Sequence, residues 1–256
     1  MYALPSAAIA VILFALIVAC NEAGVRAGQY FQARTDDDIK VQTTAIQAGL
    51  IGLLALILAF SFNLALGRYD ARAKAEMTEA NAIGTAMLRT QLLPRPYAAR
   101  AGSLFDAYVV LRLAVNQTDL TQSSVRRRLN AETGDLQARL WEVGVAASDL
   151  DPRPVTTGYF LQALNDVIDA QGARNDELRR HVPPEVFYLL FLIFGFTSAL
   201  IGYASGIGRQ QSRFPGLILS ALVCLLVFLI LDLDRPRRGL IEVRQDSMEA
   251  LRGEGG

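Results

Sequence analysis

The chain has few of the residues on which catalytic and metal sites depend. Its 256 residues include two cysteines and one histidine. Cys20 and Cys224 lie at the end of, or inside, apolar stretches, which argues against a disulfide framework. His181 has no cysteine or second histidine near it, so the sequence holds no zinc-binding spacing. The formal net charge is zero, and a neutral chain has no general attraction for nucleic acid.

Charge is also absent from four long apolar runs. Residues 1–21, 41–67, 186–208 and 214–231 contain no Asp, Glu, Lys, Arg or His. A helix needs roughly 20 apolar residues to cross a hydrocarbon core of about 30 Å. Backbone polar groups in lipid must bond within their own segment, so each run is expected to be a helix. The predicted fold is an all-α membrane protein with four transmembrane helices.

The first run has a second interpretation, as a cleaved signal peptide. Residues 17–20 resemble a lipoprotein cleavage box. Residues 1–16, however, carry no Lys or Arg, whereas a secretory signal begins with a positive region. We therefore favour a retained first helix.

Familiar catalytic motifs are missing as well. The sequence shows no nucleophile elbow, phosphate loop or dinucleotide fingerprint. The apolar runs lack the His or Asp that an intramembrane protease needs, and the ionisable residues that proton-coupled transporters place at mid-membrane. We expect no enzymatic activity, no cofactor and no bound metal. The classes of membrane protein that remain consistent with the sequence are pores, sensors and scaffolds.

Basic residues near the ends of the runs predict the orientation. One side holds ten of them: Arg68, Arg72, Lys74, Arg174, Arg179, Arg180, Arg235, Arg237, Arg238 and Arg244. The other side has fewer, diluted by acids, so the positive-inside rule puts both termini in the cytoplasm. We expect transmembrane helices one and two in 1–67, a cytoplasmic helical domain in 68–182, transmembrane helices three and four in 183–233, and a cytoplasmic tail in 234–256.

The middle segment has helical patterns and no alternating strand pattern. Apolar residues recur at helical spacing at Leu104, Tyr108, Leu111 and Val115. Asp119 suits the N-cap of a following helix, and Pro154 suits the first turn of a helix that ends near Arg180. The second transmembrane helix is expected to run on to about Leu93. The domain is therefore predicted to be a bundle of three or four helices.

Small residues mark a close contact on the third transmembrane helix. Ser198, Gly202 and Gly206 recur every four residues, a spacing that lets helix backbones approach closely. The partner helix can belong to the same subunit or to a neighbour, and both readings are structural.

The second transmembrane helix carries a small, nearly apolar stripe. It consists of Ala45, Gly52, Leu56, Ala59 and Asn63. Such a face fits a narrow hydrophobic pore gated by dewetting, and it fits a packing seam equally well.

Acidic residues outside the apolar runs are candidates for ion contacts. Asp36, Asp37 and Asp38 lie in the predicted outer loop, where an oligomeric ring would multiply their charge and favour cations; a solvated loop is the alternative. Glu22 is expected to cap the outer end of the first helix, with Arg26 as its structural partner.

Three further acids lie on the cytoplasmic side. Glu79 is expected to contribute to a polar contact between helices, with ion binding as the second reading. Asp232 and Asp234 follow the fourth membrane helix, beside three arginines. They are either paired charges at the lipid surface or a gating or ion-binding site, although a calcium cage takes six to eight oxygens.

Three motifs resemble a bacterial family of bestrophin-like membrane proteins. They are residues 22–28 (EAGVRAG), residues 68–72 (RYDAR) with 79–89, and residues 232–239 (DLDRPRRG). The resemblance implies a ring-shaped oligomeric ion channel with four membrane helices per subunit, a helical cytosolic domain and a pore lined by helix two. Asp232 and Asp234 are a reduced form of the calcium clasp of animal bestrophins, and Phe60 and Phe62 match the aromatic neck in part.

The sequence thus predicts a homo-oligomeric channel for small inorganic ions in a lipid bilayer. Its pore would be lined by Gly52, Leu56, Ala59, Phe60 and Asn63. The resemblance suggests anions and the outer acids suggest cations, and we lean slightly towards monovalent cations. The alternative is a non-conducting scaffold or sensor whose cytoplasmic domain binds a partner, with Arg126, Arg127 and Arg128 docking acidic protein or lipid.

Overall fold

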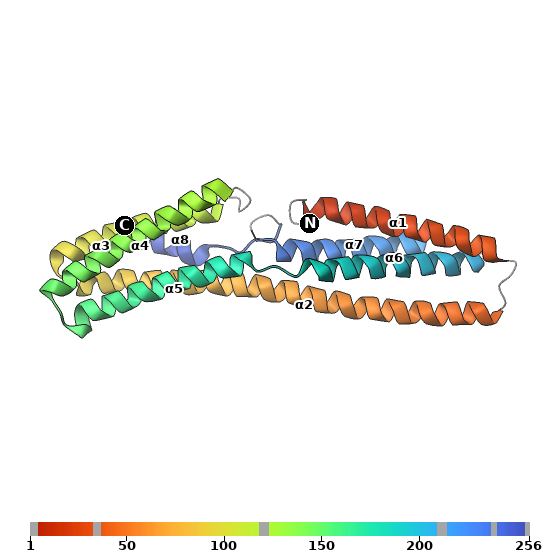
Figure 1. Ribbon diagram of the computed structural model, residues 1–256, viewed down its shortest axis with the longest axis horizontal. Coiled ribbons are helices and arrows are strands. Elements are labelled where there is room, and N and C mark those ends of the chain that lie inside the picture. The colour runs from red at the N-terminus through yellow and green to blue at the C-terminus, as the bar shows by residue number, and fades with distance from the viewer. Residues whose placement is uncertain (1–4, 33–36, 118–122, 209–213, 237–239, 254–256) are drawn as a thin grey trace. The chain divides into compact units, whose positions relative to one another are not determined.

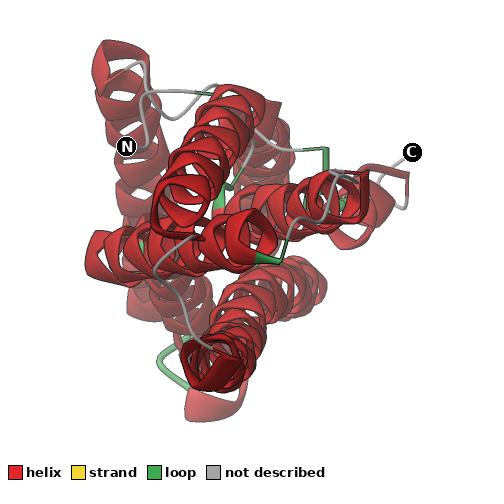
Figure 2. Ribbon diagram, turned by 90° about the vertical axis from the view of Figure 1, so that its right-hand side faces the viewer, coloured by secondary structure: helices red, strands yellow, loops and turns green. Residues whose placement is uncertain are grey.

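The computed structural model describes residues 5–32, 37–117, 123–208, 214–236 and 240–253. Regular structure in these residues is entirely helical, and they contain no strand (Figures 1 and 2). The all-α prediction is therefore confirmed.

Four helices are long and apolar enough to cross a membrane. They lie in α1 (Ser6–Phe31), α2 (Asp37–Arg89), α6 (Pro184–Ile207) and α7 (Phe214–Asp234). Each contains most or all of one predicted apolar run. Pro184 opens α6 at a first-turn position, where a missing backbone N–H costs no hydrogen bond.

The second of these helices, α2, is far longer than a membrane span. Its 53 residues correspond to about 80 Å at 1.5 Å per residue. It ends at Arg89 and passes into the 3₁₀ turn η2 (Thr90–Leu92). Pro94 follows, and the residue before a proline is disfavoured in helical geometry. The expected continuation to about Leu93 is confirmed.

The remaining helices are α3 (Arg95–Gln117), α4 (Ser123–Leu150), α5 (Tyr159–Arg179) and α8 (Asp246–Gly253). A π-helical turn, η3 (Pro154–Gly158), leads into α5. Pro154 thus begins the helical segment that ends at Arg179, as predicted. Asp119, the expected cap, lies outside the described residues.

Asp151 organises the entry to η3. Its carboxylate accepts hydrogen bonds from Arg153 Nε (2.7 Å) and Thr156 Oγ1 (2.8 Å). Its backbone carbonyl also accepts a hydrogen bond, from Thr157 Oγ1. The Arg153 guanidinium, followed by the Thr156 hydroxyl, holds the pKa of the Asp151 carboxyl well below its usual range.

The chain divides into two compact units. The membrane unit comprises residues 1–68 and 181–235 with the short stretch 239–241, and the bundle unit comprises residues 69–180, 236–238 and 242–256. Two of the chain crossings between the units fall at basic residues, since Arg68 and Arg180 each end a segment.

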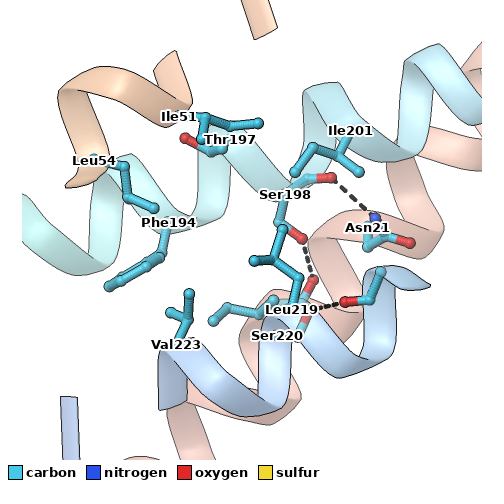
Figure 3. Close-up of a pocket in the computed structure, with 12 residues that line it drawn as sticks. Asn21, Ile51, Leu54, Phe194, Thr197, Ser198, Ile201, Leu219, Ser220 and Val223 are labelled. Carbon is cyan, nitrogen blue, oxygen red and sulfur yellow. Dashed lines mark hydrogen bonds between the residues drawn. The ribbon is translucent and has the colours of Figure 1, made fainter. Parts of the chain in front are cut away.

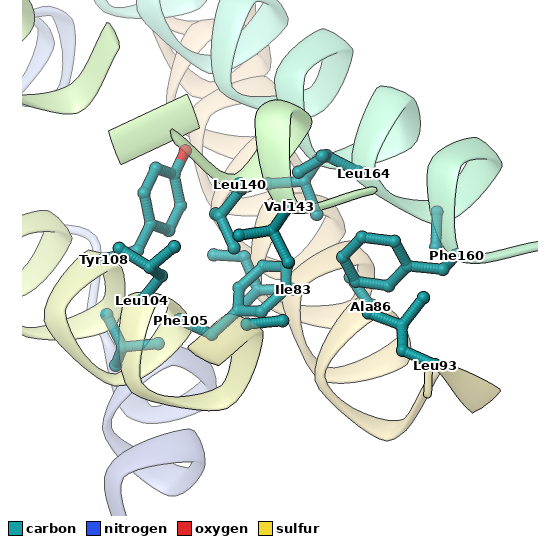
Figure 4. Packing of buried hydrophobic residues seen from close by; sticks show 14 of the residues in the cluster. Ile83, Ala86, Leu93, Leu104, Phe105, Tyr108, Leu140, Val143, Phe160 and Leu164 are labelled. Carbon is teal, nitrogen blue, oxygen red and sulfur yellow. The ribbon is translucent and has the colours of Figure 1, made fainter. Parts of the chain in front are cut away.

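The bundle unit has a core built from five helices. Ile83 and Ala86 of α2 meet Phe105 of α3, Leu140 of α4 and Phe160 of α5, all fully buried (Figure 4). The rings of Phe105 and Phe160 meet edge to face, with centroids 6.4 Å apart, a geometry that aromatic quadrupoles favour. Met248 joins this core from α8.

In the membrane unit, α1 and α6 pack backbone to backbone. A Cβ added at Gly24 would meet the Ala199 backbone, and one added at Gly202 would meet the Asn21 backbone. Ser198 Oγ donates to the Ile17 carbonyl at 2.7 Å. The small residues of the third transmembrane helix therefore serve packing within one chain, which decides between the two readings left open by the sequence.

Candidate functional site

One side of α2 is packed within its own chain. In the membrane unit the buried residues of α2 are Thr43, Leu54, Leu58, Ser61 and Ala65. From Leu54 onward their spacing of four, three and four residues follows a single helical face. This face is the seam by which α2 is held in the subunit.

The opposite side of α2 is uncovered and carries the predicted pore residues. Each member of the packed seam from Leu54 onward is preceded, two residues earlier, by a predicted pore residue: Gly52, Leu56, Ala59 or Asn63. Two residues turn a helix by about 200°, so these four residues lie on the side of α2 opposite the seam. All four are exposed, as is Phe60; the exposed fractions of Leu56 and Phe60 are 53% and 62%. The five predicted pore residues thus share the uncovered side of α2.

The outer acids are described only in part. Asp36 and the side chain of Asp37 lie outside the described residues, and Asp38 is exposed on the first turn of α2. Glu22 is half-buried and pairs with Arg26, Nε to Oε1 at 3.3 Å. The expected pairing is confirmed, but the expected capping position is wrong, because α1 continues to Phe31.

Asp232 and Asp234 lie in the last turn of α7, not after it as predicted, and their carboxylates bind backbone N–H groups. Asp232 Oδ2 accepts from Leu240 N at 2.7 Å and from Ile241 N at 2.9 Å. Asp234 Oδ1 accepts from Val182 N at 2.9 Å. Both side chains are buried. In this conformation the two acids anchor chain segments, and their role in gating or ion binding stays a prediction.

Glu79 lies at the centre of a buried ion cluster. Arg112 of α3 donates through Nε to Oε1 at 2.6 Å and through Nη2 to Oε2 at 3.1 Å. Arg174 of α5 donates through Nη1 to Oε2 at 2.7 Å. Glu79 and Arg112 are fully buried, and Arg174 is nearly so. Both oxygens of the Glu79 carboxylate thus accept hydrogen bonds from guanidinium groups, which favours a structural role in a contact between helices. A role of Glu79 in ion binding stays a prediction.

The sequence analysis missed both arginine partners. They lie 33 and 95 residues from Glu79, beyond any helical spacing. The available signal was modest: Arg112 follows Tyr108 by four residues, on the face predicted to be buried. Tyr108 is fully buried, and burial, followed by the Glu79 charge, raises the pKa of Tyr108 to about 12.

A small cavity lies among the four membrane helices (Figure 3). Its volume is about 70 Å³, several times the roughly 10–15 Å³ that one water requires. The lining is mostly apolar, with Ile51 and Leu54 from α2 and Phe194 from α6. Of its hydroxyl groups, those of Ser198 and Ser220 donate to backbone carbonyls, and Thr197 Oγ1 is the one buried hydroxyl of the lining without a hydrogen-bond partner in the described residues. A cavity of this kind does not offer an ion the polar ligands it needs.

No group of three or more His, Cys, Asp or Glu is placed to hold a metal ion in the described part of the chain. The candidate functional feature is therefore the uncovered face of α2 in the membrane unit, which carries small and apolar residues. Comparison with known proteins identifies the family in which this architecture occurs.

A family model described as the bestrophin-like domain matches residues 13–248. The chain belongs to the bestrophin-like family. Crystal structures of two variants of a bacterial bestrophin homologue from Klebsiella pneumoniae are similar to it. One has a TM-score of 0.71 at 15% identity, covering 96% of this chain and 97% of that chain. The other has a TM-score of 0.70 at 16% identity, covering 96% of each. Curated protein sequences include no match.

The bestrophin-like match extends from α1 to α8 and so includes both compact units. It confirms the resemblance drawn from the three motifs. At these identities the structural likeness shows a shared bestrophin fold. Together with the four apolar helices, it makes this bestrophin-like chain a multi-pass membrane protein.

Proposed function

We propose that this bestrophin-like protein is a homo-oligomeric ion channel of the bacterial inner membrane, with the uncovered face of α2 around the pore. Both termini and the bundle unit lie in the cytoplasm in this proposal, as the basic residues near the helix ends favour. The observation that carries it is that the stripe of small and apolar residues lies directly opposite the packed seam of α2.

Glycine on this face supports the proposal. A Cβ added at Gly49 or Gly52 would meet nothing within 4 Å, so neither glycine serves packing against the described part of the chain. Glycine weakens a helix by about 1 kcal/mol relative to alanine. Small residues on an uncovered membrane face suit a narrow passage or close contact with other subunits.

The stripe also has the polarity expected of a hydrophobic constriction. Leu56, Ala59 and Phe60 are apolar, and Asn63 is the one amide, near the end of the apolar run. A constriction of this kind closes by dewetting and opens when a small widening admits water. Asn63 would offer the first polar side chain to an ion that leaves it.

Current across a planar bilayer under a tenfold KCl gradient tests the proposal. Unitary currents are expected, and their reversal potential is expected to lie between zero and the potassium equilibrium potential. Silence in several lipids, with and without calcium, would contradict channel activity and favour a scaffold or sensor that binds a partner through the bundle unit.

Cysteine modification tests which residues line the pore. In a background with Cys20 and Cys224 replaced, Ala59→Cys is expected to lose current when a water-soluble thiol reagent is added. Leu222→Cys is the matched control, because Leu222 is also exposed (58%) but lies on α7, outside the proposed pore face. Equal modification of the two positions would contradict pore lining.

The preference for monovalent cations rests on the acids of the outer loop. Replacing Asp36, Asp37 and Asp38 together by asparagine is expected to move the reversal potential towards zero, because the ring of negative charge is lost. An unchanged reversal potential would remove this support. Glu22→Gln in the same assay tests whether the half-buried Glu22 contributes.

A further inference from the structure

The cavity of the membrane unit has a chemical feature that the proposed channel function does not use. It lies among α1, α2, α6 and α7, and all of its lining residues belong to the membrane unit (Figure 3). Much of its wall is apolar, as at Leu54, Phe194 and Val223. Thr197 is also part of the lining and is 4% exposed, and its Oγ1 has no hydrogen-bond partner in the described residues. The cavity thus combines an apolar wall with a hydroxyl that is free to bond.

Thr197 differs from other hydroxyl residues of the membrane helices. Ser61, Ser205 and Ser220 each donate to the backbone carbonyl four residues earlier, which satisfies the hydroxyl within its own helix. A buried hydroxyl that makes no hydrogen bond is costly, and lipid offers it no water. A bound molecule that accepts a hydrogen bond from Thr197 would remove this cost.

The volume of the cavity limits the size of its occupant. At about 70 Å³ it has roughly half the volume of an engineered apolar cavity of about 150 Å³ that binds benzene. It therefore suits a molecule of about three or four non-hydrogen atoms. Water is a poor occupant because it needs two to four polar partners, and the Ser198 and Ser220 hydroxyls already donate to backbone carbonyls.

The cavity is close to the outer surface of the membrane unit. Ile51 of α2 and Leu219 of α7 both line it, and their exposed fractions are 37% and 45%. Side chains rather than backbone therefore form part of the wall towards the surface, and rotation of a side chain can admit a small molecule dissolved in the bilayer.

We propose that this cavity binds a small uncharged amphiphile of the size of a short-chain alcohol, whose oxygen accepts a hydrogen bond from Thr197 Oγ1. The carbon atoms of the ligand contact Leu54, Phe194 and Val223. The lining contains no ionisable side chain, so a charged ligand would lose its hydration without compensation. Ligand efficiency limits the affinity of so small a molecule to about millimolar. This inference does not depend on channel activity.

Binding of ethanol to the full-length protein in lipid nanodiscs, measured by saturation-transfer NMR, tests the inference, with xenon as an apolar probe of the same cavity. Thr197→Val replaces the hydroxyl by a methyl group of similar size. It is expected to weaken ethanol binding about three- to tenfold and to leave xenon binding unchanged. Thr44→Val is the matched control, because Thr44 is exposed and its hydroxyl bonds the Lys40 carbonyl; it is expected to bind both probes as the wild type does.

A variant that fills the cavity gives a second readout. Ser220→Leu places a larger apolar side chain in the lining and is expected to abolish binding of both ethanol and xenon. Equal ethanol signals from wild type, Thr197→Val and Ser220→Leu would mean that ethanol only partitions into lipid, which overturns the inference. Xenon binding combined with an ethanol affinity that Thr197→Val leaves unchanged also overturns it, because the cavity then does not use its hydroxyl. Absence of ethanol binding to the wild type overturns it as well, and each of these outcomes leaves the channel proposal standing.

Discussion

At the residue scale, Glu79 is a fully buried acid of the bundle unit that pairs with two arginines. Its carboxylate faces Arg112 and Arg174 in a site without solvent access. Glu79→Gln keeps the shape but leaves two guanidinium groups buried without a counter-charge, which is expected to destabilise the protein by about 3–5 kcal/mol. Thermal unfolding in detergent measures this effect.

Glu132→Gln is the matched control for that substitution. Glu132 pairs with Arg128 on the surface, where both side chains are about half or more exposed. Such pairs contribute at most about 1 kcal/mol. If the two variants unfolded at the same temperature, the buried cluster would not be a stabilising centre.

Tyr108 gives this region a dependence on alkaline pH. Its folded pKa of about 12 exceeds the unfolded value of about 10, so the folded state keeps the phenol protonated where the unfolded state does not. The stabilising contribution is complete below pH 10 and is lost as pH rises to 12. By pH 11 it has fallen by about 1.4 kcal/mol.

Unfolding measured between pH 9 and 11 tests this assignment. Tyr108→Phe is expected to lose stability less steeply with pH than the wild type, whatever its stability at pH 9. Tyr159→Phe, at an exposed position (53%), is expected to retain the wild-type slope. Parallel slopes for wild type and Tyr108→Phe would refute the assignment.

Periodicity could predict that Tyr108 is buried, but not which charges surround it. The spacing of Leu104 and Tyr108 predicts which side of α3 is apolar and buried. The meeting of Glu79, Arg112 and Arg174 depends on how α2, α3 and α5 pack, and no local pattern records contacts 33 or 95 residues apart.

At the scale of elements, the α1–α6 contact depends on glycine. A Cβ added at Gly202 would meet the backbone carbonyl of Asn21, and backbone cannot move aside as a flexible side chain can. Gly202→Ala is therefore expected to cost about 1–3 kcal/mol through overpacking, measured as a lower unfolding temperature in detergent. Gly172→Ala on α5, where a Cβ meets nothing within 4 Å, is expected to cost much less. Equal effects would contradict the close contact.

Most helices could be predicted from the sequence because their signals are local. Charge-free runs predicted four membrane helices, and Pro154 predicted the start of the segment that ends at Arg179. The partner of the small residues at Ser198 and Gly202 could not be predicted, since a helix within the chain and one from a neighbour need the same spacing. The end of α1 was also missed, because Glu22 and Arg26 interrupt the apolar pattern while continuing the helix.

At the scale of the whole molecule, the uncovered face of α2 predicts self-association. One lining helix per subunit cannot enclose a pore, so the purified protein is expected to have the mass of several chains. Light scattering after size exclusion, corrected for detergent, gives this mass. Leu56→Cys in the cysteine-free background is expected to form disulfide-linked dimers under oxidation, and Leu225→Cys, exposed (63%) on α7, is the control. A monomer without crosslinks would contradict the assembly.

The contact between α1 and α6 also has a consequence for biosynthesis. Ile17 and its hydrogen-bond partner Ser198 are separated by 181 residues. At roughly 5–20 residues per second, a ribosome needs about 9–36 s to synthesise that interval. During this time α1 lies in the membrane without the helix that fills its glycine-lined side. Its 26 residues must therefore persist as a helix in lipid alone, until the chain that completes it has been made.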